Sequence, residues 1–183
     1  MKSSERAERD AWIQTALEDY QASLIRYARR ITGDMERARE VVQDTFLRLC
    51  RQKRSRIQGH LAEWLFTVCR NRALDVRRKE SRMTVLSEAR AESRPDPKTG
   101  PFERLEIKER SRRVLELLAS FSDNQQEVVR LKFQQGLSYR EISRVTQLSV
   151  SNIGFLLHTA LKKIRRQIEA EAEITLPSIR RIK

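Results

Sequence analysis

Residues Gly136–Arg166 decide the fold of this chain, and they read GLSYREISRVTQLSVSNIGFLLHTALKKIRR. Ser138 and Glu141 have the spacing of a capping box, in which each side chain bonds a backbone N–H group at the start of a helix. After a turn at residues 146–148, Ser149 is placed to cap a second helix. Two short helices joined by such a turn are typical of a helix-turn-helix.

The second helix of this segment, which we expect to extend to Ile168, has one buried stripe and one polar face. The stripe follows spacings of four, three and four residues: Ile153, Leu157, Ala160 and Ile164. A recognition helix contacts base edges in the major groove through its first turns, and an asparagine there, such as Asn152, can pair with adenine. A plain helical hairpin with fortuitous caps is the alternative for this segment alone.

Composition favours an all-α fold and a polyanionic partner. The 183 residues include only five Gly and four Pro, and helix-forming residues dominate the rest. The formal net charge of +13 is typical of proteins that bind nucleic acid. This charge is segregated, because residues 1–50 are neutral whereas residues 51–94 carry +7 and residues 95–183 carry +6.

The sequence predicts two small helical domains joined by a flexible linker, the second ending in the helix-turn-helix. The predicted boundaries are 1–82 for the first domain, 83–101 for a linker rich in Ser, Pro and Gly, 102–170 for the second domain and 171–183 for a tail. The expected helices before the helix-turn-helix are 5–31, 35–53, 60–82, 102–120 and 123–134. Asp123 with Gln126 is the expected cap of the last of these.

Two helices of the first domain are amphipathic. The apolar stripe of the second consists of Met35, Ala38, Val41, Val42, Phe46 and Leu49. The expected core stripe of the third consists of Leu61, Trp64, Leu65, Val68, Cys69 and Val76. A row of arginines lies opposite that stripe, and a basic connector, residues 51–59, precedes the helix. We expect these cations to contact phosphates.

Several classes of function are not indicated by the sequence. It has no Gly-rich phosphate loop and no nucleophile beside a base, so we predict no catalytic residue, no cofactor and no enzyme activity. Cys50 and Cys69 have no partners at zinc-ligand spacing, so we predict no metal site and expect reduced thiols. No apolar run has the length of a membrane span and no signal peptide opens the chain, so we predict a cytoplasmic protein without membrane insertion.

Both domains resemble those of bacterial extracytoplasmic-function (ECF) sigma factors of the sigma-70 family, over about residues 18–82 and 102–168. In the first domain, residues 42–49, VQDTFLRL, resemble the family's helix that binds core polymerase. Trp64-Leu65 with Arg70-Asn71 and residues 75–78 resemble its promoter −10 helix. In the second domain, residues 125–133 leading into 136–142, GLSYREI, resemble its −35 domain.

The resemblance implies a sigma factor that directs transcription initiation by binding core RNA polymerase and the −10 and −35 promoter elements. The residues implied to bind the coiled coil of the largest polymerase subunit are Glu40, Gln43, Asp44, Phe46 and Leu47. Those implied at the −10 element are Arg70, Asn71, Leu74, Arg77 and Arg78. Those implied at the −35 element are Ser149, Ser151, Asn152, Gly154, Phe155, His158 and Lys162. The implied partners are polymerase, promoter DNA and an anti-sigma factor.

The recognition helix departs from the family pattern, because Gly154 and Leu156 occupy positions where members carry Lys or Arg. In one explanation, which we favour, Gly154 allows close approach to DNA while Phe155 or Leu156 packs on thymine methyl groups. In the other, Phe155 and Leu156 form an apolar patch for a protein partner. The departure also leaves two alternative functions, namely a sigma-like mimic that binds an anti-sigma factor and a stand-alone helix-turn-helix regulator.

Overall fold

The computed structural model describes residues 2–84 and 120–175, with side chains described for residues 6–82 and 120–169. Every regular element in these ranges is a helix, which confirms the all-α fold. The chain divides into two compact units between Pro95 and Asp96. The helix expected at 102–120 and most of the expected linker lie outside the described residues.

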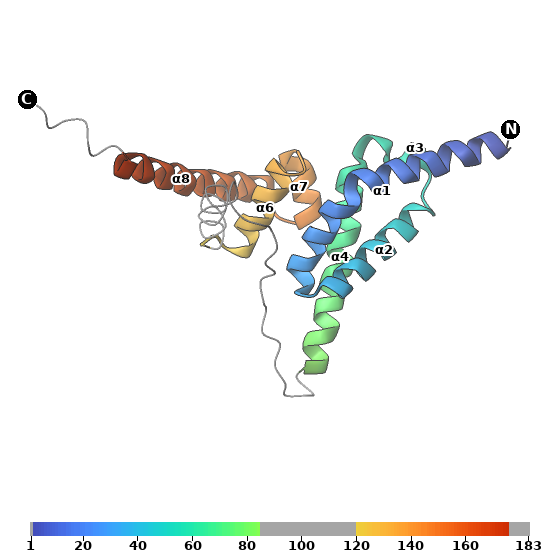
Figure 1. The fold of residues 1–183 in the computed structure, drawn as a ribbon, viewed down its shortest axis with the longest axis horizontal. Helices are drawn as coiled ribbons and strands as arrows, with labels where there is room; N and C mark the ends of the chain where they lie inside the picture. Colours follow the sequence, from blue (N-terminus) through green and yellow to red (C-terminus); the bar gives the residue numbers. More distant parts are fainter. Residues whose placement is uncertain (1, 85–119, 176–183) are drawn as a thin grey trace, which may run out of the picture. The chain divides into compact units, whose positions relative to one another are not determined.

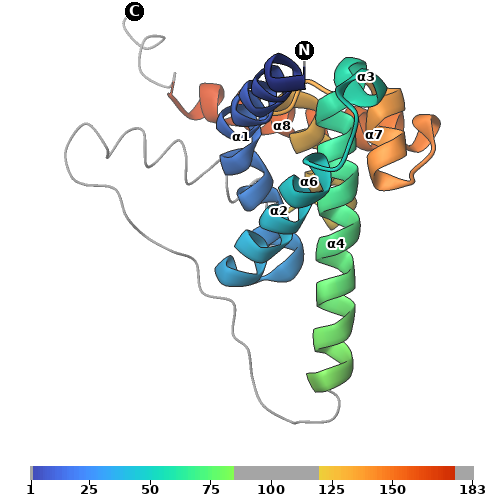
Figure 2. The same cartoon turned by 90° about the vertical axis from the view of Figure 1, so that its right-hand side faces the viewer.

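The first unit is a bundle of three long helices, in which each helix packs on the other two (Figure 1). These helices are α1 (Lys2–Thr32), α2 (Met35–Leu49) and α4 (Leu61–Thr84). A short helix α3 (Arg54–Ile57) and a 3-10 turn η1 (Gln58–His60) connect α2 to α4. The last turns of α4 extend beyond α1 and α2 in both views (Figure 2).

The turn between α1 and α2 lies where the sequence predicts a helix stop. Gly33 adopts a φ of +77°, a left-handed conformation that glycine takes without steric cost, and its N–H donates to the Arg29 carbonyl at 2.8 Å. Asp34 then caps α2, because its carboxylate accepts from the Arg37 N–H at 2.8 Å. The short connection makes α1 and α2 antiparallel neighbours.

The core of the first unit is centred on Leu24, Leu65 and Phe66, and the Phe66 ring meets Tyr27 edge to face with centroids 5.1 Å apart. The predicted stripe of α4 is partly wrong in phase. Trp64 is only half-buried, as are Leu61, Val68 and Val76, whereas Phe66 and Ala73 are buried although they were not assigned to the stripe. Trp64 therefore lies at the edge of the core.

The second helix ends at Leu49, four residues before the predicted end at Lys53. Its last bonds tighten to a 3-10 pattern, in which the Arg51 and Gln52 N–H groups donate to the Arg48 and Leu49 carbonyls. The expected basic connector is therefore partly helical. Ile57, which is buried, anchors α3 on the first unit.

The described part of the second unit contains α6 (Asp123–Phe133), α7 (Tyr139–Thr146) and α8 (Val150–Thr175), which all pack on one another. Its buried side chains come from all three helices and their flanks: Phe121, Val128, Leu131, Leu137, Ile142, Val145, Ile153, Leu157 and Ala160. The predicted α8 stripe is thus confirmed at its first three positions, while Ile164 is half-buried. Helix α8 also includes residues 171–175, which were predicted to belong to the tail.

The predicted cap of α6 is wrong by one residue. Ser122 is the N-cap and forms a capping box with Gln125, whose backbone N–H donates to the Ser122 hydroxyl at 3.4 Å. Asp123 instead lies in the first turn, where a carboxylate interacts favourably with the helix dipole. The Gln126 side chain donates to the Phe121 carbonyl at 3.0 Å.

The helix-turn-helix forms as predicted. Ser138 and Glu141 make both bonds of the capping box at the start of α7. The turn after α7 depends on Gln147, a non-glycine residue with φ of +63° whose side chain donates to the Arg144 carbonyl at 2.7 Å. The Ser143 hydroxyl closes the same turn by donating to the Leu148 carbonyl at 2.6 Å.

Candidate polymerase and DNA interfaces

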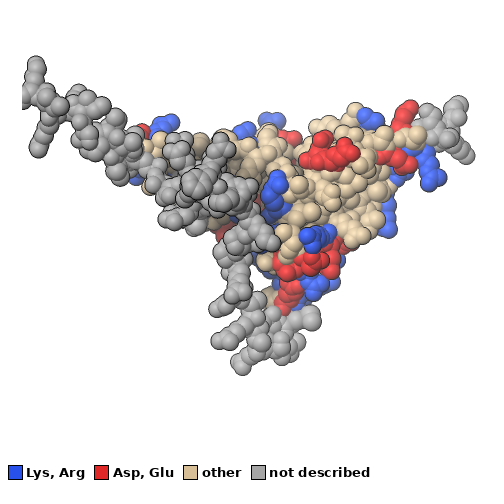
Figure 3. Space-filling model, viewed as in Figure 1, with Lys and Arg blue, Asp and Glu red and all other residues tan. Residues whose placement is uncertain are grey.

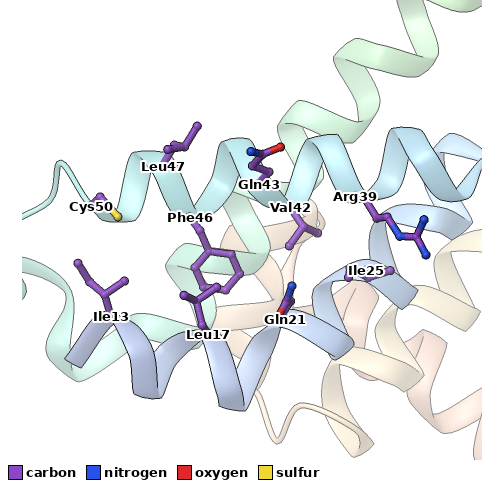
Figure 4. Close-up of a pocket in the computed structure, with 10 residues that line it drawn as sticks. All are labelled: Ile13, Leu17, Gln21, Ile25, Arg39, Val42, Gln43, Phe46, Leu47 and Cys50. Atoms are coloured by element: carbon purple, nitrogen blue, oxygen red, sulfur yellow. The ribbon is translucent and has the colours of Figure 1, made fainter. Parts of the chain in front are cut away.

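The residues predicted to bind polymerase are not equally accessible on α2. Glu40, Gln43 and Leu47 are exposed, and Leu47 retains 52% of its surface. Figure 4 shows the Leu47 side chain directed away from α1, which leaves it free to contact a partner. An exposed leucine next to polar side chains is a composition suited to protein contact.

Phe46 is the least exposed of the residues predicted to bind polymerase. The side chain retains only 7% of its surface, and its ring points toward Leu17 of α1 (Figure 4). Helical periodicity accounts for this, because Phe46 lies four residues after Val42 and so belongs to the apolar stripe of α2. The ring therefore packs within the first unit, and contact between Phe46 and polymerase stays a prediction.

Asp44 is also engaged within the fold. Its carboxylate accepts a hydrogen bond from the Arg72 Nε of α4 at 2.7 Å, and both side chains are about one-third exposed, at 40% and 32%. The pair is separated by 28 residues in sequence, so no local pattern could predict it. Asp44 links the predicted polymerase helix to the predicted −10 helix.

A groove beside Leu47 was not predicted. It lies between α1 and α2, has a volume of about 400 Å³ and is lined by both helices (Figure 4). The residues that line it are Ile13, Leu17, Gln21, Ile25, Arg39, Val42, Gln43, Phe46, Leu47 and Cys50. The sequence signal that could have indicated this groove is the pair Ile13 and Leu17, two apolar residues one helical turn apart on α1.

Charged side chains around these helices form ion pairs rather than a one-signed patch. Arg37 pairs with Glu40 at 3.2 Å and with Glu80 of α4 at 2.9 Å, and Arg39 pairs with Glu36. Figure 3 shows acidic and basic side chains intermixed there, at the edge of an uncharged area over α1 and α2. The mixture agrees with the zero net charge of residues 1–50 and suits a protein partner.

The predicted −10 residues all lie on α4, but with different exposure. Asn71, Arg77 and Arg78 are exposed, whereas Arg70 and Leu74 are half-buried. Arg78 lies 3.6 Å from Asp75, a contact between two exposed groups that a phosphate can displace. The accessible part of this set is thus a short surface of one amide and two guanidinium groups.

The predicted −35 residues lie together at the start of α8. Ser151, Asn152, Phe155, His158 and Lys162 are exposed, and Gly154 is half-buried. In a separate role, the Ser149 hydroxyl accepts from the Asn152 N–H at 3.2 Å and so caps the helix. The resemblance implies all seven residues at the −35 element, and their contact with DNA stays a prediction.

Two polar contacts connect α8 to α6 and to Phe121, which lies just before α6. Gln125 Nε2 of α6 donates to the Thr159 hydroxyl at 2.9 Å, and the Lys163 ammonium lies 5.6 Å from the centre of the Phe121 ring. Thr159 of α8 therefore contacts α6. This polar contact between helices was not predicted.

Three further observations on the described residues concern metal ions, thiols and membranes. Among them, no group of His, Cys, Asp and Glu is arranged to hold a metal ion. Burial raises the pKa of the Cys69 thiol to about 12, so this sulfur stays protonated. Within the part of the chain that the structure describes, no helix is long and apolar enough to cross a membrane.

Two family models match the chain, one in each unit. The model of Sigma-70 region 2 matches residues 16–83, and that of Sigma-70, region 4 matches residues 111–164. Curated relatives include the ECF RNA polymerase sigma factor SigL of Mycobacterium tuberculosis, 30% identical over 170 residues that cover 87% of this chain and 91% of the relative. The ECF RNA polymerase sigma factor SigM of Bacillus subtilis is 26% identical over 148 residues, which cover 80% and 88%.

A search of solved structures finds the RsbN-BldN complex, determined at 1.8 Å. It is 22% identical to this chain and covers 91% of it and 99% of its own chain. Its TM-score is 0.32, which is too low to relate the two arrangements.

Proposed function

The chain belongs to the ECF group of the sigma-70 family of RNA polymerase sigma factors. We propose that three of its surfaces bind core polymerase, the −10 element and the −35 element. Sigma factors direct transcription initiation by binding core polymerase and promoter DNA. The observation that carries the proposal is that each unit matching a sigma region exposes part of the residues that the resemblance implies for that region.

For polymerase binding, we propose the exposed side of α2, centred on Gln43 and Leu47. Leu47 supplies an apolar contact at the mouth of the groove, and Gln43 supplies an amide beside it. A helical partner placed on such a surface buries an apolar ridge between two helices. Asp44 contributes indirectly, by fixing α2 on α4 through Arg72.

For the −10 element, we propose Asn71, Arg77 and Arg78 of α4. The two arginines suit phosphate oxygens, and the amide suits a base edge. Exposure of all three side chains supports this assignment over one that relies on Leu74, which is half-buried. Phosphate contact makes the binding dependent on salt concentration.

For the −35 element, we propose the first two turns of α8. Ser151 and Asn152 reach base edges there, and His158 and Lys162 follow on the same side of the helix. Capping by Ser149 presents this turn in a fixed orientation. The polymerase forms the phosphodiester bonds, so we expect no catalytic group in this chain.

We also propose control by an anti-sigma factor and action in the bacterial cytoplasm. A protein that covers Leu47 and the neighbouring groove on α2 blocks polymerase binding directly. The cytoplasm is the compartment that holds both polymerase and promoter DNA. The free thiols of Cys50 and Cys69 are compatible with that reducing compartment.

The test is to mix the full chain with purified bacterial core RNA polymerase, isolate the complex and run off transcripts from a library of promoter fragments. We expect a stable complex and new, sequence-selective transcripts. Leu47→Ala is expected to weaken the complex, because it removes the exposed apolar contact on α2. Leu161→Ala, a similarly exposed leucine in the second unit, is the matched control and is expected to leave polymerase binding unchanged.

The outcomes separate the proposal from its alternatives. Selective binding to duplex DNA without polymerase binding supports a stand-alone regulator. Absence of both, with tight binding to an anti-sigma factor, supports a mimic. Equal polymerase binding by Leu47→Ala and the unsubstituted chain contradicts the proposed α2 contact while leaving the family assignment intact.

A further inference from the structure

Helix α8 exposes one large aromatic side chain on the side opposite its core contacts. Phe155 retains 64% of its surface, the largest exposed fraction among the exposed large hydrophobic residues of the described part of the chain. Its neighbours at helical spacing are Ser151 one turn earlier, His158 three residues later and Lys162 seven residues later, and all three are exposed. Phe155 therefore lies in the middle of the polar face.

The fold does not require an aromatic residue at this position. The core contacts of α8 come from its opposite side, where Ile153, Leu157 and Ala160 are all buried. An aromatic ring that is not used for packing is free to contact a ligand. In the major groove, the apolar group available for such contact is the C5-methyl of thymine.

Resting on the proposed function, we propose that Phe155 reads a thymine methyl group in the −35 element by apolar contact. The ring buries the methyl between itself and the groove wall. This assigns Phe155 a role in base discrimination and predicts a thymine at one defined position of the element. The contact is apolar, so it adds specificity without adding charge.

Gly154 supplies a second observation in favour of close approach. A Cβ atom built at this position meets only the Tyr139 ring, at 3.8 Å, which is ordinary van der Waals contact. Glycine in a helix interior is destabilising by about 0.5–1 kcal/mol relative to alanine, and packing within the described residues gives no reason to retain it. The missing side chain leaves room beside Phe155 for the DNA.

The edge of this surface is cationic. The Lys132 ammonium lies 5.6 Å from the centre of the Tyr139 ring and donates to the Leu137 carbonyl at 3.2 Å. Tyr139 is the first residue of α7 and is 40% exposed beside Gly154. A positive group at the flank of a recognition helix is suited to a phosphate, which positions the helix in the groove.

The structure argues against the alternative of an apolar protein-binding patch. Leu156, the other expected member of that patch, is half-buried and lies on another side of the helix. The remaining exposed apolar residues of α8 that are described, Val150, Leu161 and Ile168, lie off the face centred on Phe155. A single aromatic among polar groups fits a base contact better than a protein interface.

The experiment compares thymine with deoxyuridine, which lacks only the methyl group. Holoenzyme assembled from the full chain and bacterial core polymerase selects promoter fragments from a randomised library, and promoter affinity is then measured with deoxyuridine at each thymine of the selected element. We expect one −35 position to lose about fourfold in promoter affinity, the change that corresponds to burial of one methyl group. Phe155→Ala is expected to bind the two templates equally.

Leu161→Ala is the control, since it removes an exposed apolar side chain from the same helix and should keep the difference between the two templates. Phe155→Leu, which keeps an apolar group, is expected to keep part of the difference in affinity between the two templates. Equal use of both templates by an active holoenzyme, or an unchanged difference in Phe155→Ala, overturns this inference alone. Failure to form any holoenzyme overturns the proposed function as well.

Discussion

The two units relate their binding residues to the fold in different ways. On α2 of the first unit, residues implied for polymerase binding also hold the bundle together, since Phe46 is buried and Asp44 is bonded to Arg72. On α8 of the second unit, five of the residues implied for DNA contact are exposed, and the cap of α7 and the turn after it are formed by other residues. Substitutions should therefore confound stability with function in the first unit and separate them in the second.

The largest expected effect is that of Phe46→Ala. Removing a buried aromatic ring is expected to lower the free energy of unfolding by about 3 kcal/mol, because the ring fills the space between α1 and α2. Urea denaturation of the full chain measures this. Leu47→Ala, at the next residue, is expected to change stability by about 0.5 kcal/mol or less and to weaken polymerase binding.

A stable Phe46→Ala variant that still loses polymerase binding contradicts the core assignment. It would return Phe46 to the partner surface that the resemblance implied. The comparison of neighbouring residues is informative because both side chains are apolar and differ chiefly in exposure, 7% against 52%.

The sequence predicted most of the second unit because its signals are local. Ser138 and Glu141 are three residues apart, and the stripe beginning at Ile153 repeats at helical spacing, so both follow from short-range geometry. Two local details were missed. Ser122 and Asp123 are both good caps, and the sequence does not choose between them. Gln147 adopts a left-handed conformation, which a sequence usually indicates by a glycine, and no glycine is present there.

The site in the first unit was less predictable because it depends on contacts between helices. The bond from Arg72 to Asp44 and the groove between α1 and α2 exist only once three helices have packed. Phe46 illustrates the same limit, since periodicity placed it in the stripe while family resemblance placed it at the partner surface. Burial in the folded unit supports the packing role of Phe46.

Ser138→Ala tests whether support and recognition are separate in the second unit. Loss of the cap is expected to lower the free energy of unfolding by about 1 kcal/mol. The base preference of the −35 contact should be unchanged in the molecules that remain folded. Selection from a randomised promoter library at low temperature measures that preference, and an altered preference contradicts the separation.

The same cap predicts a pH dependence. Hydrogen bonds from the Ser138 side chain and backbone hold the pKa of Glu141 below its ordinary value. The ionised carboxylate therefore stabilises the folded state at pH above the unfolded pKa of about 4.3, and this stabilisation is lost as pH falls through the lower folded pKa. Urea denaturation between pH 7 and pH 3 should show a smaller loss in Glu141→Gln than in the unsubstituted chain.

A smaller effect is expected for the pair between α2 and α4. A double-mutant cycle of Asp44→Asn and Arg72→Gln is expected to give a coupling free energy of about 0.5–1 kcal/mol, because both side chains are partly exposed. Polymerase binding should fall in both single variants, since each loosens α2 on α4. Loss of polymerase binding in Asp44→Asn alone indicates a direct contact of Asp44 with polymerase. In that case Asp44 acts in binding rather than in holding the bundle together, and the two units differ less than proposed.

The smallest expected change in stability, Gly154→Ala, has the opposite sign. The added methyl meets only ordinary contact with Tyr139, so the helix is expected to gain about 0.5 kcal/mol. The same methyl occupies the space proposed for DNA beside Phe155, so affinity for the −35 element should fall. Thermal unfolding and promoter binding by holoenzyme measure the two quantities. A variant that is more stable and binds the promoter equally well shows that the DNA does not approach the backbone at Gly154. Stability and promoter affinity are expected to change in opposite directions only if the glycine serves binding rather than folding.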